Sequence, residues 1–396
     1  MDPLRNPYAP GAGTQPPELA GRDSLRESVR VAIGRIRAGR AAKSTVLTGL
    51  RGVGKTVLLD RLMLDAQAEG ITTIRIEAPE GRSLPSILAP ELRRTLLGLS
   101  RIEEAKDLAA RAMRGLAGFL GTMRLVYHDV QLHFDAEPEP GLADNGDLEA
   151  DLQALFEAVG EAARAARTAV VLFVDEMQYI ETKQLGALIT ALHRIAQRGL
   201  PITLVGAGLP QLPARFGTAK SYAERLFDVA TIGPLSQDDA VLAIREPAAE
   251  EGADIEPAAL DRIYELTAGY PYFLQEWGKQ SWDVARSSPI RLKDVEIASE
   301  VAVVTLDASF FHVRFDRLSP SEKLYLRAMA DLGPGPHRSG DIAEGIGRDV
   351  RSVAPVRNNL ISKGMVWSPS YGDTAFTVPL FDQFMRRIVP GDDWRP

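Results

Sequence analysis

One eight-residue segment constrains this chain more than any other feature of its sequence. Residues 49–56 read GLRGVGKT and follow the pattern G-x-x-x-x-G-K-[ST]. An apolar, β-branched run at 44–48 precedes them, and a helical pattern begins at Thr56. In such a strand–loop–helix context the backbone N–H groups of the loop converge on phosphate oxygens, helped by the positive end of the helix. The segment therefore predicts a binding site for the phosphates of a nucleotide.

The residue types in the loop are each suited to this task. Glycine lets the backbone bend tightly and approach a ligand closely. Lys55 is expected to reach the β- and γ-phosphates of ATP, and the Thr56 hydroxyl is expected to ligate Mg²⁺. The predicted nucleotide-binding residues of the loop are Gly49, Gly52, Val53, Gly54, Lys55, Thr56 and Val57.

A pair of acidic residues follows a second apolar run. Residues 169–174 read AVVLFV and lead into Asp175 and Glu176. A short, continuous apolar run is typical of a strand that is covered on both faces of a parallel sheet. This strand is expected to neighbour the one before the loop, so that Asp175 would be the further Mg²⁺ ligand and Glu176 the general base for an attacking water. A small-molecule kinase would share the loop, but it does not require this acidic pair.

The bulk composition excludes several classes of protein. A length of 396 residues predicts two or three domains, since one core rarely exceeds about 250–300 residues. No apolar run approaches the ~20 residues that cross a bilayer, and the N-terminus lacks the pattern of a signal peptide. We therefore expect a cytoplasmic protein without membrane contact. The absence of cysteine excludes disulfides and thiolate sites, and a net charge of −7 gives no global attraction to nucleic acid.

Periodicity predicts an α/β fold for the first part of the chain. Strands and helices alternate, which is typical of a parallel sheet that binds ligands at the carboxyl ends of its strands. Residues 1–22 are expected to form an extended arm, and 84–146 an inserted or peripheral helical and β region. The predicted strands are 44–48, 71–77, 123–134 (β-rich), 169–175 and 202–207, and the predicted helices are 23–38, 84–120, 147–164 and 185–197.

The second part of the chain is predicted to be mainly helical. The expected domains are an ATPase domain at 23–233, a helical lid at 234–312 and a winged helix-turn-helix domain at 313–390. The lid is predicted from helices at 237–250 and 257–286. The last domain is predicted from three helices and a β-hairpin, at 320–331, 339–346, 350–363 and 366–378.

With these motifs in place, the chain resembles an AAA+-type (ASCE) P-loop NTPase. It is most similar to the branch of origin-recognition and STAND signalling ATPases, and in particular to bacterial ATP-binding proteins with an origin-recognition-like ATPase domain and a C-terminal winged helix. The resemblance covers nearly the whole chain. It is carried by the loop, the acidic pair and the segments 17–22, 208–210, 221–227 and 269–273.

The resemblance implies further site residues. Gly21 and Arg22 belong to the segment that lies along the adenine in these families, and Pro271 to the lid element. Arg225 matches the region of an arginine finger, which acts on a neighbouring subunit of a nucleotide-dependent homo-oligomer. Two other arginines, Arg194 and Arg198, are alternatives for this role.

Two departures from the family pattern predict slow turnover. Residues 205–210 read VGAGLP and lack the polar sensor that these families place at the end of this strand. The lid element is Gly-Tyr-Pro where many relatives have an arginine. Both gaps remove groups that stabilise transition-state charge, so the sequence favours a nucleotide-dependent switch over a continuous motor.

The C-terminal region leaves two partner classes open. In a winged helix, 350–363 would read the major groove of duplex DNA, with Arg351, Arg357, Asn358, Asn359 and Lys363 as contacts. From 318 to 396, ten Lys/Arg stand against nine Asp/Glu, a net charge of only +1. Pro355 is also expected to interrupt this helix or to delay its start. The alternative is a STAND-like signalling ATPase whose winged helix binds protein.

Overall fold

The computed structural model describes residues 1–11, 19–130 and 136–391. The chain forms two compact units. The first, called here the α/β unit, comprises residues 22–49 and 55–232. The second, called the helical unit, comprises residues 1–21, 50–54 and 233–396.

A five-stranded parallel sheet forms the centre of the α/β unit, as the alternating pattern predicts. The strand order is β2-β3-β4-β1-β5. The three inner strands are buried along their whole length, because helices cover both faces of the sheet. The bounds are β1 Ser44–Thr48, β2 Thr72–Glu77, β3 Val170–Asp175, β4 Ile202–Gly208 and β5 Phe227–Thr231.

One expectation about the sheet is wrong. The strand that carries the acidic pair, β3, does not neighbour β1, because β4 lies between them. In the parallel register Thr48 pairs with Gly208, and Val174 pairs with Gly206. The three strands therefore end at one edge of the sheet, which we call the carboxyl rim.

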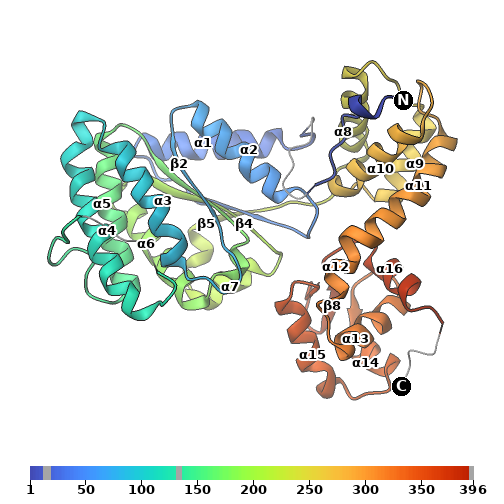
Figure 1. The fold of residues 1–396 in the computed structure, drawn as a ribbon. Coiled ribbons are helices and arrows are strands. Elements are labelled where there is room, and N and C mark those ends of the chain that lie inside the picture. Colours follow the sequence, from blue (N-terminus) through green and yellow to red (C-terminus); the bar gives the residue numbers. More distant parts are fainter. Residues whose placement is uncertain (12–18, 131–135, 392–396) are drawn as a thin grey trace. The chain divides into compact units, whose positions relative to one another are not determined.

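Within the part of the chain that the structure describes, seven α-helices pack around this sheet. Figure 1 shows α1 and α2 on one side of it and α5 and α6 on the other, with α4 outside α5. Their bounds are α1 Asp23–Arg37, α2 Lys55–Ala68, α3 Leu84–Leu99, α4 Lys106–Val126, α5 Leu148–Ala165, α6 Thr182–Gln197 and α7 Leu212–Ala219.

The β-rich stretch expected at 123–134 is wrong in the part that the structure describes. Helix α4 continues to Val126, and residues 127–130 contain no strand. Apolar residues recur here at helical spacing and are all buried, namely Leu116, Phe119, Leu120 and Met123. They form one continuous apolar face, so the helix extends into the stretch that was expected to be β-rich. Residues 131–134 lie outside the described residues. The region is also not peripheral, because side chains of α3 and α4 belong to the main hydrophobic core.

Helices dominate the helical unit. The predicted helix at 257–286 is two helices, because the backbone takes left-handed values at Ala268 and Gly269 (φ 48° and 71°). The bounds are α8 Gln237–Glu250, α9 Pro257–Thr267, α10 Pro271–Val284, α11 Leu292–Leu306, α12 His312–Phe315, α13 Pro320–Asp331, α14 Ser339–Gly345, α15 Val350–Ser362 and α16 Phe381–Ile388.

A small antiparallel sheet accompanies the last helices. Its strands are β6 His337–Arg338, β7 Val366–Trp367 and β8 Asp373–Phe376, in the order β6-β8-β7. The pairing of β7 with β8 matches the predicted hairpin. Helix α15 is continuous, so the predicted interruption at Pro355 is wrong. Pro355 is exposed and stands in the second turn, where its missing N–H leaves one helix bond unmade without ending the helix.

The first residues of the chain pack against α8 and α10, an arrangement that we call the docked arm (residues 1–11). Tyr8 is buried, its hydroxyl donates to the carbonyl of Ile244, and burial raises its pKa. The indole N–H of Trp282 donates to the carbonyl of Asp2 at 2.9 Å. A Cβ at Gly278 would lie 2.8 Å from the Tyr8 ring, so glycine is needed there for the ring to fit.

Candidate functional site

The loop at 49–56 connects β1 to α2, as the motif predicts. Gly52 and Gly54 have φ values of 82° and 87°, in the left-handed region that favours glycine. A Cβ at Gly54 would meet no heavy atom within 4 Å, so the backbone there faces open space. Lys55 and Thr56 begin α2, and the Lys55 ammonium donates to the carbonyl of Gly49 at 3.0 Å. The loop thus presents its glycines and a cation at a helix N-terminus.

Asp175 ends β3 at the carboxyl rim and is almost fully buried, with 3% exposed. Its Oδ1 accepts from the backbone N–H of Glu176 at 2.8 Å. Its Oδ2 accepts from the Arg75 guanidinium of β2 at 3.3 Å, and Arg75 also pairs with Asp60 of α2 at 2.6 Å. A carboxylate oxygen has more than one lone pair, so Asp175 retains acceptor capacity for a metal ion or a water.

Glu176 has an unusual backbone conformation. Its φ and ψ are 52° and 37°, the left-handed region that costs a non-glycine residue about 1–2 kcal/mol. A short 3-10 helix, Met177–Tyr179, follows it. The Glu176 carboxylate is half-buried and accepts from the side-chain amide of Gln178. Strain of this kind persists where surrounding contacts hold a residue in place, and it is frequent at functional sites.

Lys55 and Thr56, at the start of α2, lie at the same rim of the α/β unit as the acidic pair, with β4 between the two strands concerned. Neighbouring strands are about 4.8 Å apart, so β1 and β3 are separated by about 10 Å across β4. Lys55 and Thr56 follow the end of β1, and Asp175 and Glu176 follow the end of β3. The two pairs of residues therefore lie on either side of the end of β4.

These residues fit ATP and Mg²⁺. The open space beside Gly54 and the N-terminus of α2 suit phosphate oxygens. Thr56 and Asp175 offer the oxygen ligands that Mg²⁺ prefers. The described residues contain no group of three or more His, Asp or Glu that could hold a metal ion by themselves.

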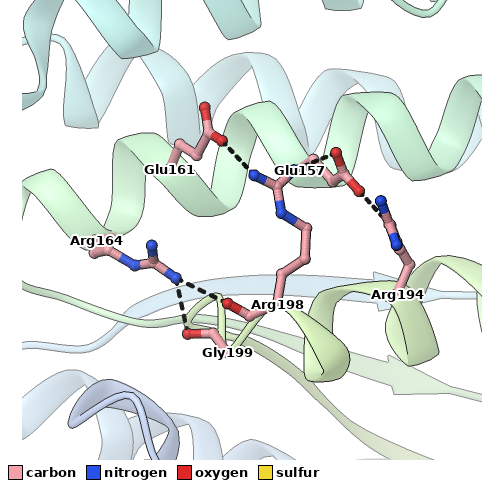
Figure 2. Close-up of polar contacts among 6 residues, drawn as sticks. All are labelled: Glu157, Glu161, Arg164, Arg194, Arg198 and Gly199. Carbon is pink, nitrogen blue, oxygen red and sulfur yellow. Dashed lines mark hydrogen bonds and ion pairs between the residues drawn. The ribbon is translucent and has the colours of Figure 1, made fainter.

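The arginines proposed as fingers differ in their surroundings. Arg194 and Arg198 of α6 both pair with Glu157 of α5, and Arg198 also pairs with Glu161 (Figure 2). These contacts hold α5 against α6 and occupy both guanidinium groups. Arg225 ends the 3-10 helix Ala223–Arg225, is exposed, and forms no ion pair within the described residues. Of the three arginines, it is the one presented to solvent without a carboxylate.

The residues implied by resemblance alone are placed as follows. Gly21 has φ 70°, and a Cβ there would overlap the Asp239 carboxylate of α8. Arg22 is the residue that precedes α1. Pro271 begins α10, and the next backbone N–H, from Tyr272, donates to the carbonyl of Gly52 at 3.3 Å. Residues 17 and 18 of the adenine segment lie outside the described residues.

Two cations of the candidate DNA-reading segment contact other residues of the same region. Arg357 donates to the hydroxyls of Thr374 and Ser368 and to the carbonyl of Asp373. Lys363 pairs with Glu322 at 2.7 Å and donates to the carbonyl of Arg317. The other candidate contacts, Arg351, Asn358 and Asn359, are exposed.

Comparison with known families bears on this geometry. Residues 18–205, which include the loop and the acidic pair, match the family model described as an AAA ATPase domain. Residues 308–385 match a domain of unknown function, DUF8462. No curated protein matches the chain. None of the helices that the structure describes is long and apolar enough to cross a membrane.

Solved structures with a similar fold include a Walker-type ATPase of Pyrococcus abyssi, with a TM-score of 0.58 and 16% identity over 94% of this chain and 97% of that one. Cdc6p from Pyrobaculum aerophilum has a TM-score of 0.48 and 16% identity over 98% of both chains. The Aeropyrum pernix ORC1 protein, solved in complex with DNA, has a TM-score of 0.45 and 17% identity over 97% and 96%. At 16% identity, the likeness to the Pyrococcus ATPase shows a shared fold.

Three residues of the rim were missed in the sequence. Gln178, Arg75 and Arg215 contact the acidic pair or the turn that follows it. Gln178 lies only two positions after Glu176, and this spacing was an available signal. Arg75 alternates with apolar residues on β2 in the manner of a solvent-facing side chain. Arg215 comes from α7, and its contact depends on the tertiary fold.

Proposed function

We propose that this protein is a slow Mg²⁺-dependent ATPase that acts as a nucleotide-dependent switch. The observation that carries the proposal is the shared rim, where Lys55 and Thr56 follow β1 and the Asp175–Glu176 pair follows β3. ATP hydrolysis by such a site uses a phosphate cradle, a carboxylate for the metal and a residue that positions the attacking water. The match of 18–205 to the AAA ATPase domain supports this assignment. Dependence on ATP also favours a cytoplasmic location.

The residues of the loop would bind ATP, and the acidic pair would direct its hydrolysis. Lys55 and the loop amides hold the β- and γ-phosphates, and Thr56 and Asp175 hold the metal. Bound Mg²⁺ neutralises charge that develops on the phosphate oxygens. Glu176 orients a water and accepts its proton. Gly21, Arg22 and Pro271 are proposed to enclose the rest of the nucleotide.

Slow turnover is expected because one copy of the chain lacks some of the positive groups that stabilise the transition state. The lid element has no arginine at 269–273, so this segment adds no positive charge. Arg225 is proposed to act on the site of a neighbouring copy, which would make hydrolysis dependent on assembly.

Phosphate release from ATP by the purified full chain tests this function. We expect release that requires Mg²⁺ and stays below the order of ten per second that is typical of enzymes. No release by a protein that binds ATP would overturn the ATPase. Release on the order of tens per second by an isolated chain would overturn the slow switch.

The C-terminal region, proposed to be a winged helix, would couple the nucleotide state to a partner. Duplex DNA contacting α15 within 350–363 is the first candidate. A STAND-like docking of protein is the second, and the internal use of Arg357 and Lys363 favours it. The remaining exposed cations of 338–363 that form no ion pair in the described chain are Arg338, Arg348 and Arg351.

A salt series of DNA binding is expected to separate these candidates. Three phosphate contacts predict that the logarithm of affinity falls with the logarithm of salt at a slope of about −3 or shallower. Arg351→Ala should reduce this slope by about one, while Arg245→Ala, an exposed arginine of α8, should not change it. Fluorescence anisotropy with a labelled duplex measures both. No binding at low salt would remove DNA and leave protein docking.

A further inference from the structure

The end of β4 lacks a polar side chain of its own but is covered by one from the neighbouring strand. A Cβ at Gly208 would lie 2.9 Å from the Oε1 of Gln178, so glycine makes space for that amide. The same Oε1 accepts from the backbone N–H of Leu209 at 3.2 Å. Gln178 therefore supplies a polar group where residues 205–210 have none.

The other end of the same amide contacts the acidic pair. The Nε2 of Gln178 donates to the Oε2 of Glu176. One side chain therefore joins the carboxylate that follows β3 to the backbone that follows β4.

The turn that carries Gln178 is itself held in place. Met177 is fully buried, and a Cβ at Gly206 would overlap its sulfur. Arg215 of α7 donates to the carbonyl of Gln178 and, at 2.6 Å, to the carbonyl of Ile180. This guanidinium is half-buried, and burial lowers its pKa. The buried Met177 side chain and the hydrogen bonds from Arg215 therefore both fix the backbone of the turn.

We infer that Gln178 is a positioning residue for Glu176 and takes the place of the polar sensor at the end of β4. This inference rests on the proposed ATPase function. General-base catalysis requires correct geometry of the base before its basicity matters. The amide ties the Oε2 side of the Glu176 carboxylate to the backbone that follows β4. Gln178 acts through Glu176 and need not contact ATP.

Gln178→Glu separates the two halves of the bridge. The new carboxylate keeps an acceptor for the Leu209 N–H and nearly the same size, but it cannot donate to Glu176 and repels it. We expect kcat for ATP hydrolysis to fall about tenfold or more, while KM for ATP changes less than about twofold. A purely structural role would move the melting temperature and leave kcat per folded molecule unchanged.

Gln184→Glu is the matched control. Gln184 makes the same pair of contacts, since its Oε1 accepts from Leu84 N–H at 2.6 Å and its Nε2 donates to Glu181 at 3.1 Å. It is buried but does not contact Glu176. We expect a lower melting temperature for this variant with an unchanged kcat. An equal loss of kcat in both variants would overturn the inference.

A second substitution tests the contact without relying on turnover. In Glu176→Gln combined with Gln178→Glu, the amide and the carboxylate exchange places and can bond again. We expect this double variant to recover most of the melting temperature lost in Gln178→Glu, while hydrolysis stays lost. No recovery of the melting temperature would show that the two side chains do not interact, and would overturn the inference.

The single variants distinguish the inference from the function on which it rests. Full hydrolysis by Glu176→Gln alone would remove Glu176 as base, and the positioning role with it. Loss of hydrolysis in Glu176→Gln together with a wild-type kcat in Gln178→Glu would overturn the role of Gln178 alone. A wild-type protein that releases no phosphate would remove both.

Discussion

Glu176→Gln is expected to bind ATP with near wild-type affinity and to hydrolyse it about 10²–10⁴-fold more slowly. The amide is nearly isosteric with the carboxylate but cannot accept a proton from water. Glu176 does not belong to the loop that grips the phosphates, so binding has little reason to change. Single-turnover phosphate release measures the chemical step, and a fluorescent ATP analogue measures affinity.

Glu77→Gln is the control for this variant. Glu77 ends β2, is exposed, and is the residue paired in register with Asp175. It therefore carries a carboxylate at the same rim but on the side away from β1. Its substitution should leave turnover within about twofold of wild type. Wild-type turnover by Glu176→Gln would exclude Glu176 as the base.

Lys55→Ala is expected to weaken ATP binding by about 10–10³-fold. Hydrogen bonds to charged groups contribute about 1.5–3 kcal/mol each, and Lys55 is expected to form them with two phosphates. Alanine is a strong helix former at the start of α2, so the free energy of unfolding should change little. Isothermal titration calorimetry with ATP and Mg²⁺ measures the loss.

Lys43→Ala provides the comparison for Lys55→Ala. Lys43 is exposed and immediately precedes β1, at the opposite end of the strand that leads into the loop. Removing its charge should leave ATP affinity unchanged. If Lys55→Ala bound ATP as tightly as wild type, the loop could not be the phosphate site.

The inner strands and the loop could be predicted because their signals are local. Residues 44–48, 169–175 and 202–207 are short segments rich in apolar and β-branched residues, which is typical of buried strands. Edge strand β5 was not predicted. Its apolar and polar residues do not alternate regularly, and most of them are exposed. Its pairing with β1 therefore depends on the tertiary fold, which leaves the free edge of β1 available to it.

The chemistry of the rim could be predicted only in part. The types and spacing of Lys55, Thr56, Asp175 and Glu176 indicate a nucleotide site without knowledge of the fold. The contact between Gln178 and the end of β4 depends on which strand lies beside β3, and strand order is not written in the local sequence. For the same reason, the position of β3 next to β1 was wrongly expected.

The docked arm has a consequence for how this protein emerges from a ribosome. Tyr8 and Ile244 are 236 positions apart, and Asp2 and Trp282 are 280 apart. Tyr8 and Asp2 therefore cannot form these contacts until synthesis has passed Ile244 and Trp282. Contacts of such long sequence separation form slowly, so docking of the arm onto α8 and α10 should be a late event in folding.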